Sequence, residues 1–422
     1  MKILIIGSGG REHALAWQCA KFDNTEEIFV APGNAGTQLE DKITNVNIGS
    51  EDVDGLIAFV KDNQVDLTIV GPEAPLVIGV VDSFQSEGLA IFGPTKAASQ
   101  LEGSKAFCKD FLDRNNIPTA FYDVFTETAP AIKYVEEKGT PIVIKADGLA
   151  AGKGVIIANT QQEAEDAIND MLEGNRFGDA GSRVVVEEFL FGEEASFIVM
   201  VDGKNILPMA TSQDHKARDN GDKGPNTGGM GAYSPAPIVT DEIFQDVMDS
   251  VIRPTVESMS AEGNPYTGFL YAGLMIDDNG NSKVLEYNCR FGDPETQPIM
   301  MRLKSNLADL CLLATKGKLD KADIEWDDRS SMGVVLAANG YPDAYPSGEV
   351  IALPVDKDDA KVFHAGTKMD GENVVTSGGR VLCATALGID TLDAQTNAYN
   401  LLDKIDWDNS YYRTDIGFKA IK

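Results

Sequence analysis

The residues best suited to chemistry lie within residues 283–298, which read KVLEYNCRFGDPETQP. Glu286 and Asn288 are two positions apart in a stretch that predicts a strand, so their side chains should share one face. A carboxylate beside an amide oxygen forms a partial Mg²⁺ site, which water and substrate phosphates complete. Arg290 continues the alternation and adds a fixed cation, which suits phosphoryl transfer to a carboxylate. A half-buried strand with polar residues facing solvent fits these residues equally well.

Lysines and glycines in a second region could hold phosphate groups. Lys105 begins a predicted amphipathic helix, and Lys145 stands at the end of a buried-looking strand in TPIVIKADGLAAGKG. The glycine-rich loop at residues 148–154 follows, and such a loop exposes backbone N–H groups and allows close approach of phosphate. The P-loop pattern is absent from it. The loop, the strand-end lysine and the Glu286/Asn288 pair together indicate a nucleotide site.

The N-terminus reads as the start of a nucleotide-type α/β unit. Residues 2–6 form an apolar, β-branched run that ends in Gly7-Ser8-Gly9-Gly10, and a helix pattern follows. This arrangement points helix N–H groups at an anion. Glu12 stands where a dinucleotide fingerprint needs glycine, which disfavours a dehydrogenase. We therefore predict a phosphate or phosphosugar at Gly9 and Gly10.

Two other segments carry polar residues at turns. Glu73 follows a predicted strand at residues 66–70 within GPEAP, where a carboxylate could accept sugar hydroxyls or simply lie in a turn. After residue 330 the pattern changes to short strands and a late helix over residues 391–405. Within that part, Gly378-Gly379-Arg380 places a cation directly after a turn.

Composition limits the class of protein. The chain has 422 residues, and 66 acidic against 36 basic residues give a net charge of −30. This charge argues against nucleic acid or an anionic membrane as a partner. Five widely spaced cysteines fit a reducing cytosol without disulfides. Neither a signal peptide nor an apolar run long enough to span a membrane is recognisable, so we expect a cytoplasmic enzyme of several domains.

An ordered set of motifs over the whole length resembles one family. The motifs are GSGGREHALAW, APGNAGT, VGPEAPLV, IFGPT, LEGSKAF, KADGLAAGKGV, SQDHK, GPNTGGMGAYSP, EYNCRFGDPETQP, HAGTK and GGRVL. Together they resemble the phosphoribosylamine–glycine ligases, or glycinamide ribonucleotide synthetases, of the ATP-grasp superfamily. Single short motifs are weak, but this ordered set is specific.

The resemblance implies a multidomain α/β and α+β fold. It has an N-terminal Rossmann-like parallel α/β domain at 1–103, a two-lobed ATP-grasp domain at 104–326 with a mobile lid lobe at about 123–190, and a small C-terminal β-rich domain at 327–422. The implied reaction joins glycine to 5-phosphoribosylamine with ATP. It yields glycinamide ribonucleotide, ADP and phosphate through glycyl phosphate, as a step of purine biosynthesis.

The resemblance also implies which residues bind ATP and metal. Lys105 and Lys145 would neutralise the α- and β-phosphates, and Glu194 would take the ribose hydroxyls. Glu286 and Asn288 would carry Mg²⁺ or Mn²⁺, while Gly273 occupies the position of an additional carboxylate found in many ATP-grasp enzymes. The lid and the adenine hinge, with the Glu187 side chain near the adenine amine, would comprise Gly152, Lys153, Gly154, Glu187, Glu188, Phe189 and Leu190.

Substrate and catalytic roles follow by the same resemblance. Asp214 and Asp293 would recognise an ammonium or amine, and Arg290 and Lys216 would serve catalysis. Glycine would be bound by Asp214, Arg290, Thr227, Gly228 and Gly229, several of them in a long polar loop at residues 211–237. The phosphosugar would be bound by Gly9, Gly10, Glu73 and Arg380. His215 is better explained by a structural hydrogen bond, and Ala217 displaces Arg218 from its usual place in the motif.

Two alternatives accompany this interpretation. One is another ATP-grasp carboxylate–amine ligase of purine synthesis, against which the SQDHK and GPNTGGMGAY segments argue. The other is a non-catalytic nucleotide or phosphosugar sensor, which would not need the arginine beside the metal. The expected partners are small-molecule substrates, with a monomer or weak dimer as the oligomeric state. A transient handover of the labile amine from the preceding pathway enzyme is compatible with this expectation.

Overall fold

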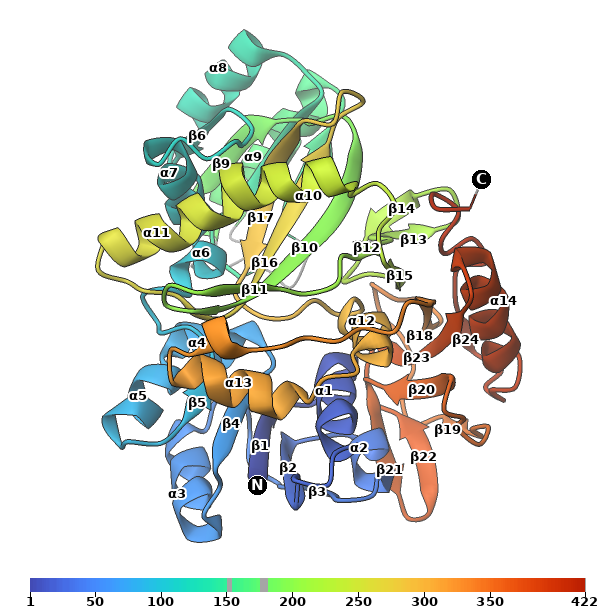
Figure 1. The fold of residues 1–422 in the computed structure, drawn as a ribbon. Helices are drawn as coiled ribbons and strands as arrows, with labels where there is room; N and C mark the ends of the chain where they lie inside the picture. Colours follow the sequence, from blue (N-terminus) through green and yellow to red (C-terminus); the bar gives the residue numbers. More distant parts are fainter. Residues whose placement is uncertain (150–153, 175–180, 422) are drawn as a thin grey trace.

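The computed structural model describes residues 1–149, 154–174 and 181–421. An N-terminal α/β region, a two-lobed central region and a C-terminal β-rich region pack closely together (Figure 1). Their cores are shared: Leu4 of the first strand lies in one apolar cluster with Val199 and Tyr287, and Ile3 lies in another with Met300. Across the described ranges, every helix is too short or too polar to cross a lipid bilayer.

The N-terminal sheet is fully parallel, as the sequence predicted, with strand order β3-β2-β1-β4-β5. The strand order reverses between β1 and β4, and ligands of such sheets bind where the strand ends diverge at this point. The strands are β1 (Lys2–Gly7), β2 (Glu27–Pro32), β3 (Ile43–Asn45), β4 (Leu67–Val70) and β5 (Ile91–Phe92). The helices are α1 (Gly10–Ala20), α2 (Ala35–Leu39), α3 (Val53–Asn63), α4 (Glu73–Ile78) and α5 (Val80–Ser86).

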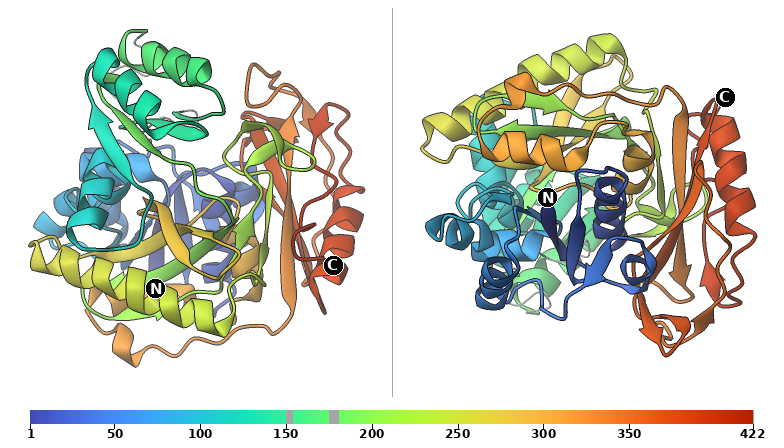
Figure 2. Two further views of the ribbon diagram at one scale, coloured as in Figure 1. Left: turned by 90° about the horizontal axis from the view of Figure 1, so that it is seen from above. Right: turned by 60° about the horizontal axis from the view of Figure 1, so that its bottom comes forward.

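The central region has two lobes, each built on an antiparallel sheet. The outer lobe, teal to green at the top of the left view in Figure 2, packs its helices on a small apolar core of its own. It consists of β6 (Tyr122–Phe125), β7 (Ile142–Ala146), β8 (Val155–Ala158), β9 (Val184–Glu188), α8 (Thr128–Lys138) and α9 (Gln161–Leu172). The inner sheet consists of β10 (Glu193–Asp202), β11 (Ile206–Pro208), β16 (Thr267–Ile276) and β17 (Ser282–Asn288).

Helices flank these sheets and join them to the rest of the chain. The predicted helix beginning at Lys105 is α7, which ends at Arg114 and is capped by the Ser104 hydroxyl. A π-helical turn at Met248–Ile252 joins α10 to α11. The remaining helices of this region are α6 (Gln100–Gly103), α10 (Asp241–Val247), α11 (Arg253–Ala261), α12 (Thr296–Arg302), α13 (Leu307–Thr315) and the short 3-10 helix η3 (Leu319–Lys321).

Strand β17 carries a bulge that the sequence did not indicate. Gly273 pairs with Glu286, whereas the next residue of β16 pairs with Val284, so Leu285 is the extra residue. The bulge lets Val284 and Tyr287, three positions apart, both face the core. Glu286 and Asn288 still share the opposite face, because the alternation resumes after the extra residue.

The C-terminal sheet includes strands from the central region, which corrects one expectation. Residues 211–237 were expected to form a long loop, but they contain four short strands. Tyr233 of β15 pairs with Met332 of β18, so the sheet order is β12-β15-β18-β23-β20. The four strands are β12 (Gln213–Asp214), β13 (Ala217–Asp219), β14 (Lys223–Asn226) and β15 (Gly231–Ser234). β13 pairs with its neighbour β14 and β12 pairs with β15, whereas β15 also pairs with the distant β18, which local sequence does not reveal.

The rest of the C-terminal region is the predicted mixture of short strands and one late helix. The helix, dark red in both views of Figure 2, covers the outer side of the sheet and ends at Leu402 rather than at residue 405. The elements are β18 (Ser330–Ala338), β19 (Val350–Ile351), β20 (Ala360–His364), β21 (Thr367–Asp370), β22 (Asn373–Thr376), β23 (Arg380–Gly388), β24 (Ser410–Tyr411) and α14 (Thr391–Leu402).

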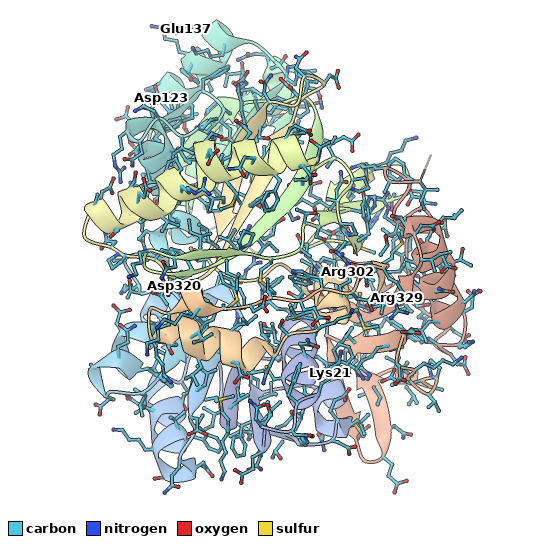
Figure 3. The ribbon with its side chains drawn as sticks, in the orientation of Figure 1. Lys21, Asp123, Glu137, Arg302, Asp320 and Arg329 are labelled. Carbon is cyan, nitrogen blue, oxygen red and sulfur yellow. The ribbon has the colours of Figure 1, made fainter. Side chains whose placement is uncertain are left out.

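Polar contacts connect the three regions. On α12, Arg302 donates to the carbonyl of Arg329 at 2.7 Å, at the entry to the C-terminal sheet (Figure 3). Between α1 and β20, the backbone N–H of His364 donates to Nδ1 of His13 at 2.9 Å. The other ring nitrogen of His13 therefore carries the proton and faces Glu40 Oε1 at 3.0 Å. Both imidazoles are buried and neutral in this contact.

Replacing His364 by glutamine should make the protein less sensitive to acid. Burial, with help from His13 and Lys361, lowers the pKa of His364 to about 3. The unfolded residue takes up a proton near its ordinary pKa of 6.5, so acidification between these values favours the unfolded chain. Each such histidine lowers the free energy of unfolding by about 1.4 kcal/mol for each pH unit of acidification within this window. Urea titrations at pH 7.5, 6 and 5 should show that the free energy of unfolding falls less steeply with acidification in His364→Gln than in the wild-type protein. Equal slopes for both proteins would contradict the expectation.

Candidate active site

A cavity of about 580 Å³ lies where the three regions meet. It contains side chains from the N-terminal strand ends, both central lobes and the C-terminal sheet. The sequence-predicted residues that line it are Glu73, Lys105, Lys145, Gly154, Glu187, Glu188, Phe189, Leu190, Glu194, Asp214, Lys216, Thr227, Gly228, Glu286, Asn288, Arg290, Asp293 and Arg380. Gly9, Gly10 and Gly229 stand behind that lining, and Gly152 and Lys153 lie outside the described residues.

A buried carboxylate between two lysines forms one wall. Glu187, on β9, makes ion pairs with Lys145 of β7 and with Lys109 of α7. Burial alone would raise the pKa of Glu187, but the two lysines outweigh burial and hold this pKa below its ordinary value. The Glu187 carboxylate is thus held by lysines, and its expected contact with the adenine amine stays a prediction.

Lys109 itself was not identified from the sequence. It stands four positions after Lys105 on α7, so both lysines lie on one side of that helix. Lys109 also donates to the Thr119 hydroxyl at 2.8 Å, and Thr119 donates to the carbonyl of Val284 at 2.7 Å. These contacts join helix α7, the segment between α7 and β6, and strand β17.

The expected metal ligands lie beside these lysines. Burial raises the pKa of Glu286, but Lys216, Lys145, Lys105 and Arg290 together lower it to about 2. The carboxylate is therefore ionised at neutral pH, as a metal ligand must be. Within the described ranges, no group of three or more His, Cys, Asp or Glu side chains is arranged to hold a metal ion. Glu286 with the Asn288 amide fits a partial site that substrate phosphates complete.

Arg290 is held between two carboxylates. Its guanidinium lies 3.1 Å from Glu73 Oε2 and 3.2 Å from Glu102 Oε1. Glu102, which also accepts the Cys289 N–H at 2.7 Å, was not predicted, because nothing in its local sequence marks it. Glu73 was expected to accept sugar hydroxyls, but here its carboxylate pairs with Arg290 and it begins α4 rather than lying in a turn.

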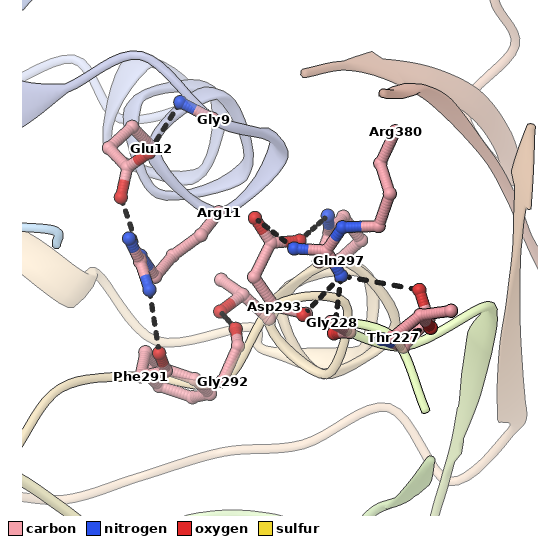
Figure 4. A network of polar contacts seen from close by, with 12 residues as sticks. Gly9, Arg11, Glu12, Thr227, Gly228, Phe291, Gly292, Asp293, Gln297 and Arg380 are labelled. Atoms are coloured by element: carbon pink, nitrogen blue, oxygen red, sulfur yellow. Dashed lines mark hydrogen bonds and ion pairs between the residues drawn. The ribbon is translucent and has the colours of Figure 1, made fainter. Parts of the chain in front are cut away.

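Arg380 draws together residues that were assigned to two different substrates (Figure 4). Its guanidinium donates to the carbonyls of Gly228 at 2.5 Å, Gly229 at 3.2 Å and Asp293 at 2.6 Å. The Asp293 carboxylate lies 3.6 Å from the same guanidinium. Asp293 was expected to recognise an amine. Arg380 and Arg11 outweigh burial and lower the pKa of Asp293, and its expected recognition of an amine stays a prediction.

The start of α1 lies directly beside this arginine network (Figure 4). The N–H of Gly9, expected to meet a phosphate, donates instead to Glu12 Oε2 at 2.5 Å. A side chain at Gly9 would come within 2.8 Å of Glu12, and one at Gly10 within 2.4 Å of Gln297, so Glu12 and Gln297 would have to move to accept a larger residue. Glu12 thus lies against the turn at Gly9, at the position where a dinucleotide fingerprint has its third glycine.

The segment carrying Asp214 divides into cavity-facing and structural residues. Lys216 makes an ion pair with Glu194 and lies 3.6 Å from Glu286. His215 is buried and its Nε2 accepts the Gly417 N–H at 2.9 Å, which supports the structural role expected for it. Arg218 pairs with Asp219 at 2.8 Å outside the cavity lining. Cys289, next to Asn288 and Arg290, is buried in the core.

Comparison with known proteins agrees across the full length. The N domain of phosphoribosylglycinamide synthetase matches residues 1–102, its ATP-grasp (A) domain residues 103–296 and its C domain residues 331–419. The phosphoribosylamine–glycine ligase of Vibrio parahaemolyticus is 67% identical over 423 residues, which cover 100% of this chain and 99% of the relative. That of Salmonella typhi is 65% identical over 425 residues, with the same shares covered.

Solved structures give the same match. The crystal structure of phosphoribosylamine–glycine ligase from Thermotoga maritima superimposes with a TM-score of 0.85 at 34% identity, covering 98% of this chain and 100% of the other. Biotin carboxylase from Campylobacter jejuni, solved with an ATP analogue, reaches a TM-score of 0.74 at 15% identity over 97% of this chain and 92% of the other. The second likeness shows a common fold alone.

Proposed function

The chain belongs to the phosphoribosylglycinamide synthetase family, and on this basis we propose how its residues perform the reaction of its relatives. It is an ATP-dependent ligase of purine biosynthesis that joins glycine to 5-phosphoribosylamine. The products are glycinamide ribonucleotide, ADP and phosphate. The observation that carries the assignment of residues is the ionised Glu286 beside Lys105, Lys145, Lys216 and Arg290 in one cavity.

The chemistry proceeds in two transfers. The carboxylate of glycine attacks the γ-phosphate of ATP, the bond to the β-phosphate oxygen breaks, and ADP leaves from glycyl phosphate. The amine of phosphoribosylamine then attacks the glycyl carbonyl carbon, loses a proton and expels phosphate. Fixed cations that face the developing negative charge supply much of the barrier reduction in such reactions. Lys145 is buried, Arg290 is partly buried, and both are held by carboxylates, so they are already oriented for this role.

Individual residues take the following positions in this proposal. Lys105 and Lys145 contact the phosphates, and Glu286 with Asn288 holds Mg²⁺ or Mn²⁺, which would neutralise phosphate charge. The backbone of residues 187–190 receives the adenine and Glu194 the ribose. We include Gly152 and Lys153 in the phosphate-covering segment, although they lie outside the described residues. The support is that the described members of this set line one cavity.

The activity is tested by ADP release with one substrate omitted at a time. Purified protein receives ATP, Mg²⁺, glycine and freshly generated phosphoribosylamine. Sustained ADP formation should require both glycine and the amine, and mass spectrometry should detect glycinamide ribonucleotide. ADP release that ignores either substrate would contradict the proposal. Binding of nucleotide without turnover would instead favour a sensor.

Replacing Arg380 by alanine should weaken binding of the phosphosugar far more than binding of ATP. Arg380 and Arg11 lie next to the start of α1, where they can hold a 5-phosphate that displaces the Asp293 carboxylate. Loss of one charge-assisted contact to phosphate typically corresponds to about a tenfold to hundredfold rise in KM. Arg329→Ala removes an arginine that pairs with Asp327 outside the cavity and serves as the control. Equal effects of Arg380→Ala on both substrates would reject this role.

The cellular setting is part of the proposal. A cytoplasmic location is supported by the free, buried state of the five cysteines. A monomer or weak dimer is supported by a cavity that one chain lines entirely. Transient handover of phosphoribosylamine from the preceding enzyme would suit a labile substrate.

A further inference from the structure

A pair of buried acidic side chains lies at one end of the cavity, and the cations that act on it are already paired with other carboxylates. Asp214, at the end of β12, and Glu295, just before α12, are both buried and both line the cavity. They are close enough for Glu295 to disfavour ionisation of Asp214, whose pKa burial and this neighbour raise well above its ordinary value. Of the nearby cations, Lys216 already pairs with Glu194 and approaches Glu286. Arg290 lies between Glu73 and Glu102, and Arg380 lies 3.6 Å from Asp293.

Asp214 has an open acceptor position. Its Oδ1 atom is buried and has no hydrogen-bond partner among the described residues. A buried acceptor without a partner costs about 1–3 kcal/mol, so such atoms usually await a ligand or a water molecule. The chemistry of that ligand therefore also depends on the neighbouring carboxylate of Glu295.

Glu295 is held in a fixed orientation. The Ser196 hydroxyl donates to Glu295 Oε1 at 3.0 Å, and Ser196 lies 2.9 Å from the hydroxyl of Tyr271. Because Ser196 has a single proton to donate, Tyr271 is the donor in the second contact. Gly292 leaves room on the other side, since a Cβ there would lie 2.3 Å from Glu295 Oε2. The carboxylate cannot swing away from the cavity without losing these contacts.

We propose that Glu295, together with Asp214, binds the ammonium group of the glycine substrate. The inference rests on the proposed function and adds the subsite that selects an amino acid. A small cation with N–H donors satisfies both carboxylates and the open Asp214 oxygen. Lys216 connects this end of the cavity to Glu286, so an ammonium here places the attached carboxylate toward the metal and phosphate side. Asp293, surrounded by arginines, does not offer such a place.

Glu295→Gln tests the subsite without changing the size of the side chain. The KM for glycine should rise about tenfold to hundredfold, the effect expected for a hydrogen bond to a charged group, while the KM for ATP stays unchanged. Glycolate, which replaces the ammonium by a hydroxyl, serves as the probe. Wild-type protein should bind glycine much more tightly than glycolate, and the variant should lose most of this preference. Glu325→Gln, at an exposed residue paired with Lys304, is the matched control.

A second variant separates an effect on the glycine subsite from misfolding of Glu295→Gln. Ser196→Ala keeps both carboxylates but frees Glu295, and it should shift glycine KM in the same direction by a smaller factor. Parallel increases in KM for ATP, or an unchanged preference for glycine over glycolate, would overturn the proposal. Loss of a bound Mn²⁺ ion from Glu295→Gln, counted by electron paramagnetic resonance, would overturn it in favour of a second metal site. If wild-type protein lacks glycine-dependent ADP release, the proposed function fails rather than this subsite alone.

Discussion

Glu286→Gln should lower kcat by about a hundredfold or more and raise the Mg²⁺ concentration needed for half-maximal activity. The amide cannot supply the negative charge that a divalent cation requires. It also leaves Lys105, Lys145 and Lys216 without the carboxylate that lies among them. Repulsion among these lysines should then weaken their own contacts with ATP phosphates.

Metal binding gives the decisive measurement for this variant. Mn²⁺ titrations followed by electron paramagnetic resonance, in the presence of a non-hydrolysable ATP analogue, should show weaker binding by about tenfold or more. Glu372→Gln makes the same chemical change at an exposed turn between β21 and β22 and should behave as wild type. An unchanged Mg²⁺ dependence in Glu286→Gln would remove Glu286 from the metal site.

Lys109→Met should lower the free energy of unfolding by about 3 kcal/mol, because it leaves a buried carboxylate with one of its two partners. Glu187 and Lys109 are both almost fully buried, and water cannot replace the lost charge. The KM for ATP should rise as well. Without Lys109, Glu187 holds Lys145 more strongly and competes with the phosphates for it.

The double variant Lys109→Met/Glu187→Gln separates charge from packing. If the unpaired carboxylate causes the destabilisation, the double variant should be more stable than Lys109→Met alone in urea titrations. Lys133→Met breaks an exposed pair with Glu137 and should change stability by less than about 1 kcal/mol. Additive effects of the two substitutions would show that the ion pair is not the cause.

The parts of the site that could be predicted are those set by local pattern. Alternation along β17 placed Glu286 and Asn288 on one face, and the family resemblance placed Arg380 near Gly9 and Gly10. Both hold in the structure, where Arg380 contacts Asp293 and a Cβ at Gly9 would lie 3.2 Å from Asp293 Oδ2. The parallel order of the first sheet also followed from apolar strands separated by helices.

The parts that could not be predicted depend on partners distant in the chain. Glu102 meets Arg290, and Glu187 meets Lys109, only after separate strands and helices have packed together. The small strands in residues 211–237 lack a clear apolar alternation, and β15 is stabilised by pairing with β18. The bulge at Leu285 arises from the register between two strands, which neither strand contains alone.

The shared sheet has a consequence for the protein during its synthesis. Asp214 leaves the ribosome before the C-terminal region, but β15, which pairs with its strand β12, needs β18 at Ser330–Ala338, and β18 in turn needs β23 at Arg380–Gly388. A nascent chain whose two central lobes have already been synthesised therefore still lacks the strands that hold Asp214 in the cavity. Ligase activity should arise only near the end of translation, so incomplete chains would not consume ATP in the cell.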